Sequence, residues 1–288
     1  MSSVCTIFAD MNTYQQLYQR LSHLYEKGEA QAIVRLLLDM RFDLSLADIY
    51  AGKVTELSPN DTIELEKMMG RLEAGEPVQY VLGQASFHGY IYKVCPGVLI
   101  PRPETAELVD WIAEDRRPDL SVLDIGTGSG CIAVTLALLL PQAKVTAWDI
   151  SPVALQVAAE NARKYDADVT VVKQDTLQAL ADGRQWDVIV SNPPYIAEQE
   201  RAAMDRNVLD YEPSLALFVA DDDPLLFYRA ISRYAIKSLK NGGELFFEIN
   251  PRYINELQSL LADIGFTVVE VRNDQYGKQR MIKASCKR

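Results

Sequence analysis

The alternation of short apolar segments with amphipathic ones after Pro118 constrains the fold more than any other feature of this 288-residue chain. Such alternation is typical of an α/β domain in which helices cover both faces of a mostly parallel sheet. A short turn at Tyr276 and Gly277 joins the last two apolar segments, so we expect one antiparallel strand at the end of the sheet. The seven expected strands are residues 121–124, 144–149, 169–173, 186–191, 244–248, 267–272 and 279–284.

The N-terminal part of the chain shows a different period. Its apolar residues recur at helical spacing, as in Leu17, Leu21 and Leu24. This period predicts a small helical bundle. The segment Ser58-Pro59-Asn60-Asp61 is a typical start for the last of its helices. We therefore expect an N-terminal helical domain over residues 1–84.

A connecting segment is expected over residues 85–102. The aromatic and β-branched residues around His88 and Gly89 suit a β-hairpin. Pro103 then suits the first turn of a helix, because its missing N–H needs no partner there. The α/β domain is expected to occupy residues 103–288.

Composition limits the classes of partner. Hydrophobic residues make up 48% of the chain and charged residues 24%, as in ordinary globular proteins, so most of the chain should fold. The formal net charge of -11 repels polyphosphate chains, so we expect no direct nucleic-acid partner.

The cysteines Cys5, Cys95, Cys131 and Cys286 lack C-x-x-C spacing, which predicts reduced thiols and no metal site.

Neither a membrane span nor a secretion signal is expected. The longest apolar stretch, residues 132–140, is too short to cross a bilayer. Residues 1–10 lack the basic start and the apolar stretch of a secretion signal. We therefore expect no membrane partner and a cytoplasmic location.

A glycine-rich segment directly follows the first expected strand. Gly126-Thr127-Gly128-Ser129-Gly130 separates this strand from an apolar helical segment. Glycines let the backbone approach a ligand closely, and a helix N-terminus offers free N–H groups to an anion. The dinucleotide fingerprint is G-x-G-x-x-G, whereas these glycines alternate strictly after Asp124, which favours S-adenosylmethionine over a nicotinamide cofactor. We expect all five residues to bind this cofactor, with Asp124 near its ammonium group.

Acidic residues after the next two strands extend this candidate site. Asp149 ends the second expected strand, where a carboxylate can accept hydrogen bonds from both ribose hydroxyls of an adenosine. Asp175 and Thr176 follow the third strand and suit the amino edge of the adenine. The alternative is that the glycines form only a tight turn and the acids only cap helices.

The segment Asn192-Pro193-Pro194-Tyr195 follows the fourth expected strand, and so should lie beside the glycine segment at the carboxyl edge of the sheet. An amide nitrogen is a poor nucleophile, because its lone pair is delocalised into the carbonyl. The Asn192 side-chain oxygen and the Pro193 carbonyl can accept from both N–H bonds of one NH2 group, and the two prolines fix the backbone.

We therefore expect Asn192, Pro193 and Tyr195 to be catalytic, with Tyr195 stacked on a flat target. All four residues of the segment are expected to bind the substrate, and Asn192 should also border the cofactor. The alternative is a turn that only terminates the strand.

These motifs resemble the protein release-factor glutamine methyltransferase family over nearly the whole chain. The most specific segment is Pro101-Arg102-Pro103-Glu104-Thr105, because Asn-Pro-Pro-Tyr also occurs in adenine-N6 methyltransferases. Asn250 is a departure, since a glycine is common there in the family. The segments that carry the resemblance are residues 77–80, 82–83, 100–105, 124–130, 149, 192–195, 212–213 and 274–280.

The resemblance implies a Rossmann-like class I methyltransferase fold and S-adenosylmethionine-dependent N5-methylation. Its target would be the glutamine in the glycine-glycine-glutamine loop of class I peptide chain release factors. Asn192 and Pro193 would hold the glutamine amide, and residues 101–105, Thr105 included, would line the cofactor pocket. The helical domain over residues 1–84 would help to bind the release factor.

The residues alone leave other activities open. An adenine-N6 methyltransferase acting on DNA or RNA would use a similar NH2 group, although the acidic charge opposes it. A non-catalytic nucleotide-binding interaction protein would keep the glycine segment without transferring a methyl group. A nicotinamide oxidoreductase is the third alternative, and the glycine spacing speaks against it.

Overall fold

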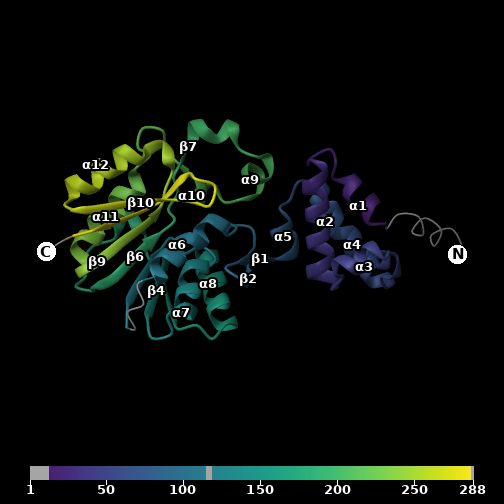
Figure 1. The fold of residues 1–288 in the computed structure, drawn as a ribbon, viewed down its shortest axis with the longest axis horizontal. Coiled ribbons are helices and arrows are strands. Elements are labelled where there is room, and N and C mark those ends of the chain that lie inside the picture. The colour runs from purple at the N-terminus through teal and green to yellow at the C-terminus, as the bar shows by residue number, and fades with distance from the viewer. Residues whose placement is uncertain (1–12, 115–118, 287–288) are drawn as a thin grey trace, which may run out of the picture. The chain divides into compact units, whose positions relative to one another are not determined.

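The computed structural model describes residues 13–114 and 119–286, and Figure 1 shows its helices and strands. Cys5 and the rest of residues 1–12 lie outside the described residues. The expectations for that thiol and for a secretion signal in residues 1–10 therefore stay predictions.

The chain folds into two compact units. The first unit contains Met1–Gly83 and Arg206–Tyr211, and the second contains Gln84–Asp205 and Glu212–Arg288. Each unit has its own hydrophobic core. The first unit therefore includes a short segment that lies far along the chain from the rest of it.

The first unit is a bundle of helices, which confirms the prediction from the apolar period. Its core includes Leu17, Leu21, Leu37 and Leu65, all fully buried. Leu24 belongs to the same apolar period but is 45% exposed, because it lies in the turn after the first helix. The helices are α1 (Tyr14–Arg20), α2 (Lys27–Phe42), α3 (Leu46–Tyr50), η1 (Lys53–Glu56), α4 (Pro59–Glu73), α5 (Val78–Leu82) and α9 (Arg206–Tyr211).

Specific contacts satisfy both ends of α4. The helix begins where the sequence predicts, since the Ser58 hydroxyl accepts a hydrogen bond from the Asp61 N–H at 3.2 Å and Pro59 occupies the first turn. At the other end, the Tyr211 hydroxyl donates to the carbonyl of Ala74 at 2.9 Å. Because helix ends leave carbonyls without intrahelical partners, this contact joins α9 to the bundle.

A β-hairpin starts the second unit, as the sequence predicts. Strand β1 (Gln84–Phe87) pairs with β2 (Tyr90–Lys93) in antiparallel register. Its two-residue turn requires positive φ, which His88 adopts at 49° and Gly89 at 78°. Helix α6 (Pro103–Ala113) follows, with Pro103 in its first turn as expected.

The seven expected strands all form one sheet, which confirms the α/β prediction. In spatial order they are β10, β11, β9, β6, β3, β4 and β5. Strand β9 begins at Leu239, earlier than the expected residue 244, and continues through Gly242 and Gly243. The strands are β3 (Ser121–Ile125), β4 (Lys144–Asp149), β5 (Val169–Lys173), β6 (Trp186–Ser191), β9 (Leu239–Glu248), β10 (Val268–Asn273) and β11 (Gln279–Ser285).

The antiparallel strand does not lie at the end of the sheet, so this part of the prediction is wrong. Strand β11 is antiparallel to both β9 and β10, and β10 occupies the edge. In this order Met281, Ile282 and Ala284 of β11 are buried, whereas no residue of the edge strand β10 is.

Helices cover both faces of the sheet (Figure 1). Side chains of successive strand residues point to opposite faces, and in β6 Val188 and Val190 pack with α6, α7 and α8 while Ile189 packs with α11 and α12. These helices are α7 (Cys131–Leu139), α8 (Pro152–Lys164), α11 (Leu226–Ser238) and α12 (Ile254–Ile264). The remaining short elements are η2 (Thr176–Gln178), β7 (Ile196–Ala197), η3 (Glu198–Ala203), α10 (Ser214–Leu217), β8 (Phe218–Val219) and η4 (Pro251–Tyr253).

The cysteines within the described ranges are free thiols. They are Cys95, Cys131 and Cys286. Burial raises the pKa of the Cys131 thiol to about 12, so this thiol stays protonated at neutral pH. Of the helices that the structure describes, none has both the length and the apolar character needed to cross a bilayer.

Replacing Gly130 by alanine is expected to destabilise the second unit. Its φ of +80° is unfavourable for an L residue, and an added Cβ would lie 3.1 Å from the Cα of Ala158 in α8. We expect Gly130→Ala to lower the free energy of unfolding in urea by about 2–3 kcal/mol. Gly183→Ala is the matched control, because Gly183 has a φ of +87° and open space around it. Equal losses in both variants would show that the contact with Ala158 is unimportant.

Candidate active site

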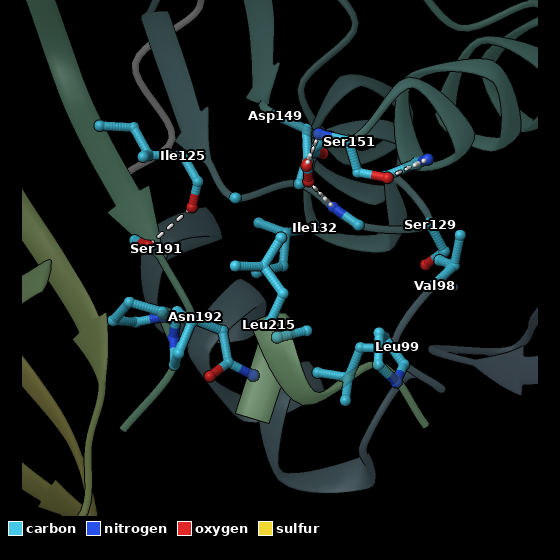
Figure 2. Close-up of a pocket in the computed structure, with 18 of the residues that line it drawn as sticks. Val98, Leu99, Ile125, Ser129, Ile132, Asp149, Ser151, Ser191, Asn192 and Leu215 are labelled. Atoms are coloured by element: carbon cyan, nitrogen blue, oxygen red, sulfur yellow. Dashed lines mark hydrogen bonds between the residues drawn. The ribbon is translucent and has the colours of Figure 1, made fainter. Parts of the chain in front are cut away.

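A cavity of about 280 Å³ opens at the carboxyl ends of the central strands. Open α/β sheets bind their ligands at this edge. Figure 2 shows Asp149 and Asn192 on opposite sides of the cavity. The predicted site residues that line it are Thr105, Gly126, Thr127, Gly128, Ser129, Asp149, Thr176, Asn192, Pro193 and Pro194.

The glycine turn after β3 is tied to the end of β4. The N–H groups of Gly126 and Thr127 both donate to the carbonyl of Trp148 at 2.9 Å, and the Gly128 N–H donates to the Asp149 carboxylate at 2.9 Å. Gly126 and Gly128 have φ values of +74° and +56°, and a Cβ at either position would meet nothing within 4 Å. The turn therefore leaves room for a ligand to approach the backbone closely.

The Asp149 carboxylate is shared between two loops. Besides the Gly128 N–H, it accepts a hydrogen bond from the Ser151 N–H at 2.9 Å. Burial raises the pKa of this carboxyl, while both N–H groups act in the opposite direction by stabilising the ionised form. Each oxygen retains a lone pair, so the carboxylate can still accept from the two hydroxyls of a ribose.

Asp124 lies behind the glycine turn and outside the cavity lining. Its side chain is fully buried, and the Thr127 hydroxyl donates to it at 2.6 Å. Burial raises the pKa of Asp124 to about 7. The Asp124 carboxyl therefore contacts the glycine turn, whereas the sequence analysis expected it to lie near the ammonium group of the cofactor.

Besides Asp124, three predicted site residues do not line the cavity. Gly130 is where α7 begins and packs closely against Ala158. Asp175 accepts a hydrogen bond from the Leu177 N–H at 2.9 Å and thereby caps η2. Tyr195 packs against the core between the sheet and α11, where burial raises the pKa of its hydroxyl. The ring of Tyr195 is partly buried, and its expected stacking on the substrate stays a prediction.

A chain of hydrogen bonds connects Asn192 to Glu248. The Asn192 NH2 group donates to the Thr105 hydroxyl at 3.3 Å, and this hydroxyl donates to the Glu248 carboxylate at 2.6 Å. The Tyr195 hydroxyl donates to the other carboxylate oxygen at 3.0 Å. The sequence analysis assigned no role to Glu248, although a carboxylate directly after the apolar residues 245–247 was a usable signal, because buried charges are rare.

Glu212 is a second residue whose contacts the sequence analysis missed. Its side chain is buried, and its two oxygens accept hydrogen bonds from the Arg102 guanidinium at 2.7 Å and from the Ile100 N–H at 3.1 Å. Arg102 and its neighbours Leu99 and Pro101 line the cavity. Glu212 therefore holds one side of the cavity in place.

The cavity suits S-adenosylmethionine better than a cofactor that carries a pyrophosphate. Among the described residues that line it, the charged ones are Asp149 and Arg102, and Glu212 already pairs with Arg102. A pyrophosphate would therefore find no free cation in this lining. The glycine turn and the carboxylate of Asp149 instead match a ligand that combines a methionyl group with an adenosine.

Comparisons with known proteins agree with this geometry. Residues 12–83 match the PrmC N-terminal domain, and residues 104–210 match the Methyltransferase small domain. The release factor glutamine methyltransferase of Bacteroides thetaiotaomicron is 46% identical over 268 residues, which cover 93% of this chain and 96% of that protein. The chain belongs to the release factor glutamine methyltransferase family.

A second member of this family extends the match to almost the full length. The release factor glutamine methyltransferase of Flavobacterium psychrophilum is 39% identical over 279 residues, which cover 95% of this chain and 98% of that protein. Membership of the family and the methyltransferase domain make the chain an S-adenosylmethionine-dependent methyltransferase.

Solved structures share the fold. A methyltransferase from Pyrococcus furiosus matches with a TM-score of 0.52 at 18% identity, and the match covers 77% of this chain and 99% of that chain. Together with the seven-stranded sheet, this likeness confirms the Rossmann-like class I methyltransferase fold.

Asp124→Asn is expected to flatten the dependence of stability on pH. The pKa of about 7 for Asp124 lies above that of an aspartate in an unfolded chain, near 4. Between these two values the folded protein holds a proton that the unfolded chain has released, so the free energy of unfolding falls as the pH rises.

Urea unfolding at pH 5 and at pH 7.5 measures this effect. The wild type should lose about 2–3 kcal/mol more between the two pH values than Asp124→Asn does. Asp119→Asn, at an exposed turn, is the control and should follow the wild type. If Asp124→Asn shows the same slope as the wild type, burial does not control this carboxyl.

Asp149→Asn is expected to weaken binding of S-adenosylmethionine. The change replaces one acceptor oxygen by an NH2 group, so the side chain can no longer accept from both the Gly128 N–H and the Ser151 N–H, and one charge-assisted hydrogen bond to the ribose is lost. Titration calorimetry should show a dissociation constant about 10–100-fold higher. Asp168→Asn, at an exposed loop, should bind as the wild type does. Unchanged binding by Asp149→Asn would remove Asp149 from the cofactor site.

Proposed function

We propose that this protein transfers the methyl group of S-adenosylmethionine to the side-chain amide nitrogen, N5, of a glutamine in class I peptide chain release factors. The glutamine is that of the glycine-glycine-glutamine loop. The observation that carries the proposal is that Asn192 and Pro193 line the same cavity as the glycine turn. Relatives up to 46% identical carry the name release factor glutamine methyltransferase, which supports this choice of substrate.

The proposed roles of Asn192 and Pro193 follow from the chemistry of an amide. Its nitrogen is a poor nucleophile, because the lone pair is shared with the carbonyl. The Asn192 side-chain oxygen and the Pro193 carbonyl would accept from the two N–H bonds and hold the nitrogen in one orientation. The rings of Pro193 and Pro194 limit motion of this backbone, so both acceptors are in place before the substrate binds.

When bound, S-adenosylmethionine supplies an electrophilic methyl group on a positively charged sulfonium. The residues of the site then have to align the nitrogen with that methyl group rather than to remove a proton first. The surplus proton of the methylated amide can leave to solvent after transfer, so the scheme does not depend on an imidazole. The only two histidines of the chain, His23 and His88, are accordingly assigned no role.

We also assign the helical unit a part in binding the release factor, by analogy with the family. The match of residues 12–83 to the PrmC N-terminal domain supports this assignment. A direct nucleic-acid partner is not proposed, because the net charge of -11 opposes one. Since release factors act on cytoplasmic ribosomes, we place the enzyme in the cytoplasm.

Asn192→Ala is expected to abolish most methyl transfer without abolishing cofactor binding. Loss of one preorganised polar contact to the reacting group should lower kcat by about 100–1,000-fold. Mass spectrometry of the release-factor tryptic peptide, before and after incubation with enzyme and S-adenosylmethionine, measures the transfer. Titration calorimetry of the variant should still show binding of the cofactor.

The control variant is Asn255→Ala, on an exposed position of α12, which should methylate as the wild type does. Release factor and nucleic acid are offered side by side with tritiated S-adenosylmethionine. Label on nucleic acid alone would establish an adenine-N6 methyltransferase instead. Cofactor binding without label on either substrate would favour a non-catalytic protein.

A further inference from the structure

The hydrogen bonds between Glu248, Thr105 and Asn192 form a relay that ends at the proposed acceptor of the substrate. Glu248 is 1% exposed at the carboxyl end of β9, and its Oε2 accepts from the Thr105 hydroxyl at 2.6 Å. The Thr105 Oγ1 in turn accepts from the Asn192 Nδ2 at 3.3 Å. Neither Glu248 nor this use of Thr105 follows from the need to bind a cofactor.

Counting protons shows what the relay determines. The hydroxyl of Thr105 has one proton, and the short contact with Glu248 uses it. Towards Asn192 the same hydroxyl can therefore only accept a hydrogen bond. If the side-chain amide of Asn192 were flipped by a half turn, its oxygen would face the Thr105 oxygen. Two acceptors would then lie opposite each other, which is unfavourable.

We propose that Glu248 is a positioning residue which, through Thr105, keeps the side-chain oxygen of Asn192 directed at the substrate amide. This inference rests on the function proposed above, since it concerns the orientation of the same acceptor. An NH2 group presented by Asn192 would repel the N–H bonds of the glutamine, whereas an oxygen accepts from them.

The other oxygen of Glu248 supports the far end of the same segment. It accepts from the Tyr195 hydroxyl at 3.0 Å, and the Asn250 NH2 group donates to the Tyr195 carbonyl at 3.1 Å. One carboxylate thus reaches both ends of the Asn192-Pro193-Pro194-Tyr195 segment, Tyr195 directly and Asn192 through the Thr105 hydroxyl. These contacts hold Tyr195 in its partly buried position against the core.

The hydroxyls of Thr105 and Tyr195 donate to the two oxygens of Glu248. Burial raises the pKa of this carboxyl, while the two hydroxyls and the guanidinium of Arg280 on β11 act in the opposite direction by favouring its ionised form. Glu104 on α6, a more remote carboxylate, raises the pKa further. An ionised Glu248 accepts from both hydroxyls at once and so defines the direction of the relay.

Substitution of Thr105 tests the relay directly. Thr105→Val keeps the shape of the side chain but removes the acceptor, and kcat for methylation of the release factor should fall about tenfold or more. The KM values for S-adenosylmethionine and for the release factor should change less than about threefold, because the relay acts on orientation and not on binding. Thr105→Ser keeps the hydroxyl and should recover most of the lost kcat. Thr170→Val, at an exposed position of β5, should leave both constants unchanged.

Substitution of Glu248 tests the origin of the relay. Glu248→Leu frees the proton of Thr105 to point at the Asn192 oxygen, and kcat should fall about tenfold. Glu248→Gln keeps one oxygen for Thr105 and can donate to the Tyr195 hydroxyl, so kcat should stay within about fivefold of the wild type. If Glu248→Leu does not fold, Thr105→Val alone decides.

A measurement on the protein without substrate completes the test. In protein labelled with [15N]asparagine, the resonances of the Asn192 NH2 group are those absent from Asn192→Ala. They should shift in Thr105→Val and keep their positions in Thr105→Ser, because only the former loses the acceptor. This comparison remains decisive for the relay even if the wild type fails to methylate a release factor, which would refute the proposed function.

Three results would overturn the inference. Thr105→Val could raise the KM for S-adenosylmethionine at unchanged kcat, which would make Thr105 a cofactor residue as the family resemblance implies. The Asn192 resonances could be the same in Thr105→Val and in the wild type. Glu248→Leu could fold and retain the kcat of the wild type.

Discussion

The site depends on three neighbouring parallel strands, β4, β3 and β6, that end at the same position along the sheet. In the register of the sheet, Ile125 of β3 pairs with Trp148 of β4 on one side and with Ser191 of β6 on the other. Two further contacts hold the ends together: the Ser191 hydroxyl donates to the Ile125 carbonyl at 2.6 Å, as Figure 2 shows, and the glycine turn donates to the Trp148 carbonyl. A shift of one strand by one residue would turn its side chains to the opposite face and separate the cofactor turn from Asn192.

The local sequence pattern was enough to predict the helices and strands and most of the proposed site residues that line the cavity. The predictions of strand β4 and of the start of α6 depend on short apolar segments and on a proline at the first turn of the helix. Such signals extend over only a few residues. The positions of Thr127 and Asp149 follow because parallel strands end at one edge. The place of β11 was not predictable in this way, because the hairpin turn determines only the relative direction of its two strands and leaves open which of them pairs with β9.

The side chains whose surroundings the sequence did not predict share a physical cause. Asp124 and Tyr195 have the chemical groups that a site needs, but contacts across the fold decide whether such groups face a cavity or the core. Glu248 and Glu212 are buried carboxylates in an acidic chain, and each is stabilised by donors from segments distant in sequence. No rule of sequence spacing connects Thr105 with Glu248. The hydrogen bonds between Glu248, Thr105 and Asn192 can be recognised only in the folded structure, where α6, β6 and β9 bring these residues together.

The membership of α9 in the helical unit has a further consequence. Because Arg206–Tyr211 belongs to the first unit, the polypeptide passes between the two units three times. A gene segment that ends at Gly83 would encode the bundle without the Tyr211 hydroxyl that caps α4 at Ala74. Recombination at a single junction therefore could not exchange the helical unit intact.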